Sequence, residues 1–304
     1  MSRTPWHFGL LQVPCLMGIV NVTPDSFSDG GRFFDAAAAA EQARELVRAG
    51  AGIVDLGAEA SSFFREEIEP VAAEEQIGRL LPVLERLRDL PEGVAISIDT
   101  RSAAVAEAIL RRRSAGDARG WIINDVSAGM HDAAILPTVA AHRAAIVLMH
   151  MSPGFPATPA VDDPDIVVTV RADLAKRITA AKWAGIPAER VAVDPGIGFG
   201  KTMADNWRLA FWANETVPEN AGGAVVVLGA SRKRFLETEP PGDVGLPAAW
   251  GDLVDSLRGP ETSSHARDPA SAALTALTIR QGVPIHRVHN VSLAARAMWE
   301  LRKI

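Results

Sequence analysis

Residues 17–31 of this chain read MGIVNVTPDSFSDGG, an apolar run that ends at Asn21 and passes into a polar, glycine-rich loop. In a barrel of parallel strands, the active site forms from side chains at the carboxyl ends of the strands and in the loops that follow. Asn21 and the loop from Thr23 to Phe27 are therefore candidates for a functional site. If the fold is such a barrel, other strands should end in the same way.

Short apolar or β-branched runs alternate along the chain with longer stretches rich in Ala, Leu and Arg. This alternation is typical of parallel strands joined by helices. The expected strands cover residues 15–21, 53–56, 95–99, 121–125, 145–149, 191–194, 224–229 and 285–289. The expected helices cover residues 36–49, 72–87, 102–113, 132–142, 165–184, 203–214, 269–281 and 292–302. About eight such units predict an α/β fold, a (β/α)8 TIM barrel formed as a single domain over residues 1–304. An open doubly wound sheet is the rival, but the GxGxxG turn that it favours after the first strand is absent.

Residues 237–268 interrupt this pattern between the seventh strand and its helix. The segment is long, acidic and rich in Pro and Gly, and loops of this length are uncommon inside compact domains. We expect a surface insertion with a short helix near residues 250–257, rather than a partner contact or a partly disordered segment.

Composition excludes several classes of protein. With 304 residues, 48% of them hydrophobic, the chain can bury a large core. A formal charge of -6 argues against a nucleic-acid or anionic membrane partner, although a local basic pocket is still allowed. Cys15 is the single cysteine, which excludes a disulfide framework and suits a reducing compartment. Because no signal peptide or membrane span is visible, we expect a cytoplasmic protein.

Polar side chains stand at or near the end of nearly every expected strand. They are Asn21, Asp55 with Glu59, Asp99, Asn124 with Asp125, Met149 with His150, Asp194, Ser231 to Lys233, and Arg287 with His289. A lone Asp or Asn after a strand is more often a helix cap or a turn residue than a ligand-binding group.

These strand ends, however, sort by chemistry into two groups. Asp99, Asn124 and Asp194 offer acceptors suited to the donor-rich edge of an aminopterin-like heterocycle. Lys233, Arg287 and His289 offer cations suited to an oxyanion or a diphosphate. The pattern predicts one pocket that holds a heterocycle at one end and a phosphate group at the other.

Residues 194–202, DPGIGFGKT, form a second glycine-rich loop, whose spacing is not that of a P-loop. Its glycines permit close backbone approach, and Phe199 among them could form an aromatic wall for a flat ring; contact with phosphate is the alternative. Lys201 is expected to start a helix or face solvent.

Five histidines are expected in the N-terminal arm, in helices or in loops, namely His7, His131, His142, His265 and His286. No His or Cys spacing in the sequence resembles a zinc site. Asn21 together with substrate phosphate oxygens is compatible with Mg²⁺.

Seven segments in this order resemble the signatures of the dihydropteroate synthase family: MGIVNVTPDSFSDGGRF, SIDT, INDVSAG, LMHM, DPGIGFGKT, GASRK and RVHNV. The resemblance implies a (β/α)8 barrel that joins 6-hydroxymethyl-7,8-dihydropterin diphosphate to p-aminobenzoate in folate synthesis. It further implies Mg²⁺, a homodimer and a sulfonamide target.

The resemblance also implies roles for individual residues. Asn21, Lys233, Arg287 and His289 match catalytic positions; Asn21 matches the metal ligand, and Asn21, Arg287 and His289 the diphosphate site. The pterin site matches Asp99, Asn124, Met149, Asp194, Phe199, Gly229 and Lys233. The loops around p-aminobenzoate match Phe27, Ser61, Arg65 and Ser231.

The second loop departs from the family sequence Glu-Ser-Thr-Arg-Pro-Gly. Aligned from Glu59, Ser61 takes the threonine position and the arginine is lost; aligned backwards from Glu69 and Pro70, Arg65 takes the arginine position after about three extra residues. We prefer the second alignment. Asn290 replaces the usual aspartate after His289, and Ala128 replaces a glycine.

An active dihydropteroate synthase is the main hypothesis, and a non-catalytic pterin-binding paralogue is the alternative. A barrel methyltransferase that uses a methylated folate is disfavoured, because it would have no use for a diphosphate site.

Overall fold

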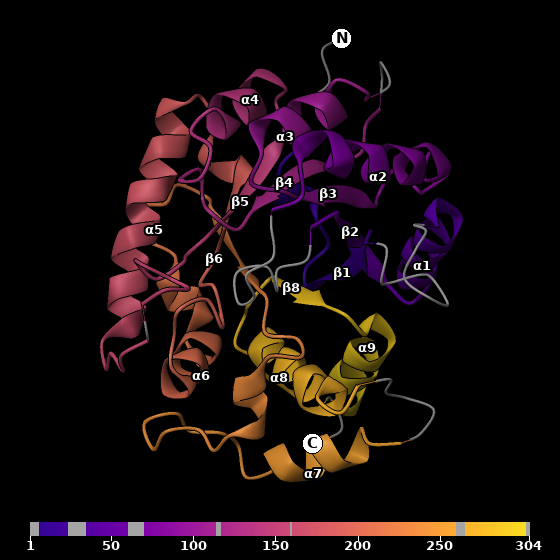
Figure 1. Ribbon diagram of the computed structural model, residues 1–304. Coiled ribbons are helices and arrows are strands. Elements are labelled where there is room, and N and C mark those ends of the chain that lie inside the picture. Colours follow the sequence, from indigo (N-terminus) through magenta and orange to yellow (C-terminus); the bar gives the residue numbers. More distant parts are fainter. Residues whose placement is uncertain are drawn as a thin grey trace.

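The computed structural model describes residues 6–23, 35–59, 70–113, 117–158, 160–259 and 265–301. Within these residues, parallel strands form a closed barrel in chain order from β1 to β8, and β1 pairs with both β2 and β8. The predicted (β/α)8 barrel is therefore confirmed, and the open sheet is wrong (Figure 1). The strands are β1 (Cys15–Asn21), β2 (Ala51–Gly57), β3 (Ala95–Asp99), β4 (Trp121–Asp125), β5 (Ala145–Met149), β6 (Val191–Asp194), β7 (Val225–Leu228) and β8 (Ile285–Val288).

Helices surround the strands in the alternation that the sequence predicts (Figure 1). They are α1 (Ala36–Arg48), α2 (Ala73–Arg86), α3 (Ala103–Leu110), α4 (Ile135–Ala141), α5 (Ile166–Trp183), α6 (Met203–Phe211), α7 (Trp250–Ser256), α8 (Asp268–Arg280) and α9 (Val291–Glu300). Short 3₁₀ helices are η1 (Phe8–Leu10), η4 (Ala188–Arg190), η5 (Ala213–Thr216) and η6 (Arg234–Glu237).

Helix α4 begins three residues later than predicted, at Ile135. The predicted first residue, Asp132, accepts hydrogen bonds from the backbone N–H groups of Ala103 and Ala134, at 2.8 and 3.1 Å. Its carboxylate therefore caps the first turn of α3 and shapes the turn before α4, as Asp commonly does outside a helix.

Strand residues alternate between two apolar cores, because successive side chains point to opposite faces of a sheet. Outward-facing residues such as Val54, Ile96 and Ile146 pack under the helices. The inward-facing residues form a plug in the barrel that contains Met17, Ile53, Ala95, Ile122, Ala145, Val147, Ala192, Val227 and Ile285. We call this set the lower layer.

The N-terminal arm closes the lower layer. Phe8 packs with the lower layer at 3% exposure, and its ring centroid lies 5.3 Å from that of Trp6. At Gly120 a Cβ atom would lie 2.3 Å from the indole of Trp6, so only glycine leaves room for the arm. This end of the barrel is thus filled, and ligand access is left to the opposite end.

The segment between β7 and α8 contains α7, close to the helix predicted near residues 250–257. Leu253, Val254 and Leu257 pack against α8 and α9 in an apolar cluster separate from the two barrel cores. Figure 1 places α7 on the outer side of α8. In the described part of the chain no helix is long and apolar enough to cross a membrane.

Candidate functional site

Polar side chains line the barrel interior two residues beyond the lower layer. Ile53 is followed by Asp55, Ile122 by Asn124, Ala192 by Asp194 and Ile285 by Arg287. A step of two residues returns to the same face of a strand, so these groups point inward at the carboxyl end of the barrel. We call Asp55, Ser97, Asp99, Asn124, Asp194 and Arg287 the upper layer.

Arg287 ties the upper layer together. Its Nε donates to Oδ2 of Asp55 at 2.7 Å, and its Nη2 donates to Oδ2 of Asp99 at 2.8 Å. Asn124 adds a donor to the same oxygen of Asp55 at 3.3 Å. Asp55 is fully buried and had no predicted role; it holds the guanidinium in place.

One guanidinium is shared by the fully buried Asp55 and the partly buried Asp99, and it affects the protonation of Asp99. Burial raises the pKa of Asp99, and the nearby carboxylates of Asp55 and Asp125 raise it further. Arg287 opposes this shift but does not cancel it. Burial also disfavours charged Arg287, but the carboxylates of Asp55, Asp99 and Asp194 outweigh this effect and hold its pKa above the ordinary value. Arg287 therefore stays charged while Asp99 gains a proton more readily than an exposed aspartate.

A cavity of about 350 Å³ opens above the upper layer. It brings together every predicted site residue that the structure describes, namely Asn21, Asp99, Asn124, Met149, Asp194, Phe199, Gly229, Ser231, Lys233, Arg287 and His289. The other three predicted residues, Phe27, Ser61 and Arg65, lie outside the described residues. The grouping predicted from the strand ends is thus found in one cavity, while the role of each residue stays a prediction.

The loop between β6 and α6 shapes one wall of this cavity. Oδ1 of Asp194 accepts the backbone N–H of Gly196 at 2.7 Å, and burial raises the pKa of Asp194. Gly196 has a φ of 72°, and a Cβ there would lie 1.8 Å from the carbonyl oxygen of His150, so glycine is required. Nζ of Lys233 lies 4.5 Å from the ring centroid of Phe199, which places a cation against an aromatic wall.

Of the two predictions for Lys201, the helix start is close, because Lys201 directly precedes the α6 N-cap Thr202, but exposure to solvent is wrong. Lys201 is 7% exposed, and its Nζ donates to the carbonyl oxygens of Phe199 and His150 at 3.1 and 3.4 Å. The turn at Gly196 folds the loop back over β5, which buries the ammonium group. Burial lowers the pKa of Lys201 to about 7, so this lysine fastens the loop to the barrel rather than meeting solvent.

His289 lies at the end of β8 in a cationic and largely buried setting. Burial, with Arg232 and Arg287 nearby, lowers its pKa to about 3. The imidazole is therefore neutral at pH 7 and acts as a hydrogen-bond donor or acceptor, not as the cation predicted from the sequence. Ser231, predicted near p-aminobenzoate, lies beside this ring, with Oγ 3.0 Å from Nδ1.

Two other histidines are structural. His286 lies within β8, inside the strand predicted over residues 285–289, and its Nε2 is 2.7 Å from Oγ1 of Thr278 on α8. Burial lowers its pKa to about 3. His150 points toward α5, where its Nε2 lies 3.4 Å from Oδ2 of Asp173, and burial lowers its pKa to about 4. Neither ring lines the cavity.

Two further residues take ordinary backbone roles. Oδ1 of Asp125 accepts hydrogen bonds from Oγ and the backbone N–H of Ser127, at 2.7 and 2.8 Å, so this strand-end aspartate forms a turn. Ala128, which stands where the family has glycine, has a φ of 52°. A glycine would adopt this left-handed conformation without strain.

A second cavity of about 440 Å³ adjoins the first and shares Ile19, Asn21 and His289 with it. It extends past Arg232 toward the start of α9, where Asn290 and Ser292 line it. Among the described residues no group of three His, Cys, Asp or Glu side chains could hold a metal ion. Asn21, exposed between the two cavities, offers one amide oxygen, which fits a cation that is bound mainly by ligand oxygens and water.

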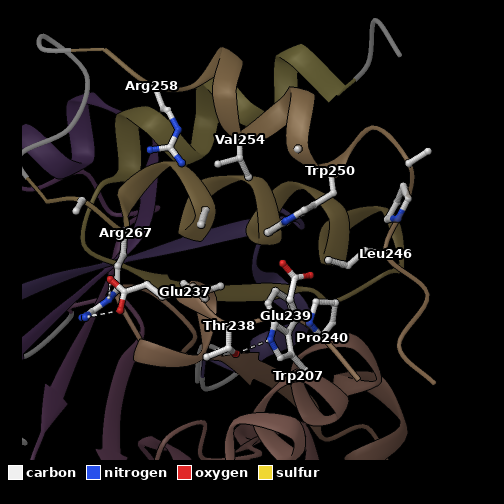
Figure 2. Close-up of a pocket in the computed structure, with 16 residues that line it drawn as sticks. Trp207, Glu237, Thr238, Glu239, Pro240, Leu246, Trp250, Val254, Arg258 and Arg267 are labelled. Atoms are coloured by element: carbon white, nitrogen blue, oxygen red, sulfur yellow. Dashed lines mark hydrogen bonds and ion pairs between the residues drawn. The ribbon is translucent and has the colours of Figure 1, made fainter. Parts of the chain in front are cut away.

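A third cavity, of about 530 Å³, lies away from the barrel mouth. Figure 2 shows Trp207, Trp250 and Leu246 on one side of it and the ion-paired Glu237 and Arg267 on another. The predicted insertion, with α7, supplies most of its wall. This cavity contains none of the predicted site residues.

Comparison with known proteins places the whole barrel among pterin enzymes. A family of pterin-binding enzymes matches residues 17–289. The dihydropteroate synthase of Mycobacterium leprae is 37% identical over 286 residues, which cover 93% of this chain and 90% of that protein. The mitochondrial folate synthesis bifunctional protein of Pisum sativum is 36% identical over 288 residues, and this chain spans 50% of its length.

Solved structures give the same result. The dihydropteroate synthase of Xanthomonas albilineans with 4-aminobenzoic acid superposes with a TM-score of 0.73 at 35% identity, covering 96% of this chain and 94% of that one. The same enzyme in complex with 7,8-dihydropteroate gives a TM-score of 0.71 at 33% identity over the same shares.

Proposed function

This chain belongs to the pterin-binding enzyme family, and we propose that it is a dihydropteroate synthase, a transferase that condenses 6-hydroxymethyl-7,8-dihydropterin diphosphate with p-aminobenzoate. The products are 7,8-dihydropteroate and diphosphate. The observation that carries the proposal is the cavity at the barrel mouth, which combines buried acceptors with a lysine, an arginine and a histidine. The dihydropteroate synthase of Xanthomonas albilineans, solved with 4-aminobenzoic acid and with 7,8-dihydropteroate, shares this fold over 94% of its chain.

The pterin ring would lie between the buried acceptors and the aromatic wall. Asp99, Asn124 and Asp194 come from β3, β4 and β6, and their oxygens suit the amino and ring N–H groups of a pterin. Phe199 offers a flat surface, and Lys233 beside it offers a donor for a ring oxygen or nitrogen. The Asp99 carboxyl, with its raised pKa, could also donate a proton in a hydrogen bond.

The diphosphate would lie toward the second cavity. Asn21 and His289 line both cavities, and Arg287 closes the first from below. His289 would contribute a neutral N–H donor, while Arg287 and Lys233 contribute positive charge. When bound, Mg²⁺ would neutralise the leaving diphosphate, and Asn21 is the described residue that would hold it.

In the reaction the bond between the pterin methylene carbon and the diphosphate oxygen breaks, and the oxygen keeps the electron pair. A cation-like methylene results, which the amino nitrogen of p-aminobenzoate attacks to form a C–N bond and then loses a proton. The residues of this chain would act by positioning the pterin and by stabilising the charge that develops on the diphosphate. The upper layer is held by its own ion pairs, so it would not need to reorganise during the step.

A non-catalytic pterin-binding paralogue is the second candidate, because the sequence of residues 59–70 departs from the family pattern. The homodimer implied by the resemblance and the cytoplasmic location expected from the sequence also stay predictions.

The deciding experiment is a coupling assay. Purified protein is given the pterin diphosphate, Mg²⁺ and p-aminobenzoate, and released diphosphate is compared with p-aminobenzoate consumed. A synthase should give a ratio of one. Tight pterin binding without turnover that depends on p-aminobenzoate would instead identify the paralogue.

A further inference from the structure

The turn between β7 and η6 has an unusual backbone, held by a buried ion pair. Arg232 has a φ of 61°, a conformation that side chains with a Cβ rarely adopt. Its Nε donates to Oδ1 of Asp268 at 2.6 Å, and its Nη2 donates to Oδ2 at 3.0 Å. Asp268 is 1% exposed at the start of α8, so this is a bidentate pair with one fully buried partner.

Further contacts hold both members of the pair. The backbone N–H of Arg232 donates to Oγ of Ser271 at 2.9 Å, and Nη1 of Arg267 donates to the Arg232 carbonyl at 3.3 Å. Nδ2 of Asn290 donates to Oδ2 of Asp268 at 3.2 Å, while the Asn290 Oδ1 caps α9 through the N–H of Leu293. Asp268 therefore joins the turn after β7 to the start of α9.

Ser231 connects this array to the proposed diphosphate site. Its Oγ accepts the backbone N–H of His289 at 3.2 Å and lies 3.0 Å from Nδ1 of the His289 ring. An oxygen that already accepts one hydrogen bond can use its own hydrogen toward the lone pair of Nδ1. In that arrangement Nε2 of His289 carries the ring hydrogen and is the donor available to an anion.

We propose that Asp268 is a positioning residue for His289: through Arg232 it fixes the turn so that the Ser231 hydroxyl holds His289 in the tautomer protonated at Nε2. The inference rests on the proposed function, in which His289 binds diphosphate. It explains why a carboxylate that lines neither cavity at the barrel mouth is fully buried against an arginine. It also gives a role to Asn290, which stands where the family has aspartate. In this chain the carboxylate belongs to Asp268, and the side-chain amide of Asn290 donates a hydrogen bond to it.

The test exchanges the two groups. Asp268→Asn removes the charge, and Asp268→Asn with Asn290→Asp returns one carboxylate to the same contact. Asp255→Asn is the matched control, because Asp255 forms an exposed pair with Arg258 on α7 at 2.9 Å. For each protein we would measure turnover, binding of inorganic diphosphate and of 6-hydroxymethylpterin by calorimetry, and the His289 tautomer from ¹⁵N NMR shifts.

Asp268→Asn should weaken diphosphate binding and turnover by about 10- to 100-fold, as misplacement of a binding group does, while pterin binding is kept. The double variant should recover at least about tenfold, a coupling expected for residues in contact. The ¹⁵N shifts should report protonated Nε2 in the wild type and a mixture in Asp268→Asn.

Three outcomes would overturn the proposal: unchanged diphosphate binding in Asp268→Asn, equal weakening of pterin and diphosphate, or a folded double variant without recovery. If Asp268→Asn does not fold, the double variant alone decides, since it should fold and bind diphosphate. A wild type that binds both ligands but never consumes p-aminobenzoate would remove the proposed function and leave this inference standing on diphosphate binding.

Discussion

The lower and upper layers of the barrel interior are made by the same strands and differ completely in chemistry. On β4 the lower layer has Ile122 and the upper layer has Asn124; on β8 the corresponding residues are Ile285 and Arg287. The lower layer is apolar and closed by the N-terminal arm, whereas the upper layer is an ionic network beneath a cavity. A step of two residues, about 7 Å along a strand, separates side chains that only pack in the core from polar side chains at the cavity.

The difference implies that the two layers respond to substitution in different ways. Removing an apolar side chain from the lower layer should cost stability alone, because nothing there reaches a ligand. Removing a charge from the upper layer should cost both stability and activity, since the same groups hold one another and face the cavity.

Arg287→Met should have the largest effect. The fully buried carboxylate of Asp55 and the partly buried carboxylate of Asp99 lose their shared cation, which should lower the free energy of unfolding by about 3 kcal/mol. Turnover should fall about a thousandfold, because a donor to the developing charge is lost. Urea unfolding and steady-state kinetics measure the two effects, with Arg287→Lys as the variant that keeps the charge. A Met variant as stable as the wild type would show that the ion pairs do not hold the upper layer.

Ile122→Ala tests the lower layer. Ile122 is fully buried, so the cavity left behind should cost about 3 kcal/mol of stability, while turnover at saturating substrate stays near that of the wild type. The matched variant Asn124→Ala, two residues along β4, should weaken pterin binding, and it should also cost some stability because its hydrogen bond to Asp55 is lost. Unfolding curves and pterin titrations of the two variants test whether the layers differ in this way. Loss of turnover in a folded Ile122→Ala protein would contradict the separation of the layers.

His286→Gln tests the outward face of β8 through pH. The pKa of His286 is about 3 in the folded protein and 6.5 as the ordinary value, so between these limits the unfolded chain binds a proton that the folded chain does not. The stability from neutral His286 is therefore complete above pH 6.5 and declines as the pH falls, by up to about 1.4 kcal/mol per pH unit. In unfolding measured from pH 7 to pH 4 the variant should show a shallower slope, since His289 and His150, whose pKa values burial also lowers, keep their own contributions. An identical slope in both proteins would contradict the assignment.

Phe199→Leu should have the smallest effect. It keeps an apolar wall but removes the aromatic face under Lys233, which should cost about 1 kcal/mol, or roughly fivefold in pterin affinity. Phe211→Leu is a control outside the cavity, since that ring packs with Trp212 at 6.1 Å. Calorimetry with 6-hydroxymethylpterin compares them. Equal losses in both variants would remove the aromatic wall from the proposed site.

The fold, and the set of residues that line the cavity, follow from local patterns in the sequence. Short apolar or β-branched runs that alternate with helical stretches predict the strands, and polar residues at their ends predict which side chains share the mouth of the barrel. Asp99, Asn124, Asp194 and Lys233 are therefore found together where the alternation of strands and helices requires.

Features that depend on tertiary contacts were not predictable in the same way. Lys201 is buried because the turn at Gly196 carries the chain back over β5, and no spacing in the sequence indicates that path. His289 is neutral at pH 7 because of burial and the nearby Arg232 and Arg287, so its residue type alone suggested a cation. Asp55 was seen as a strand-end carboxylate, but its partner Arg287 lies 232 residues later.

That long separation has a consequence for how the protein becomes active. Arg287 lies on the last strand and reaches the second and third strands, across 232 and 188 residues. During synthesis, a chain that contains every strand but the last carries both carboxylates without the cation that they share in the complete barrel. We therefore expect the ion-pair network of the upper layer to form only when β8 closes the ring between β1 and β7.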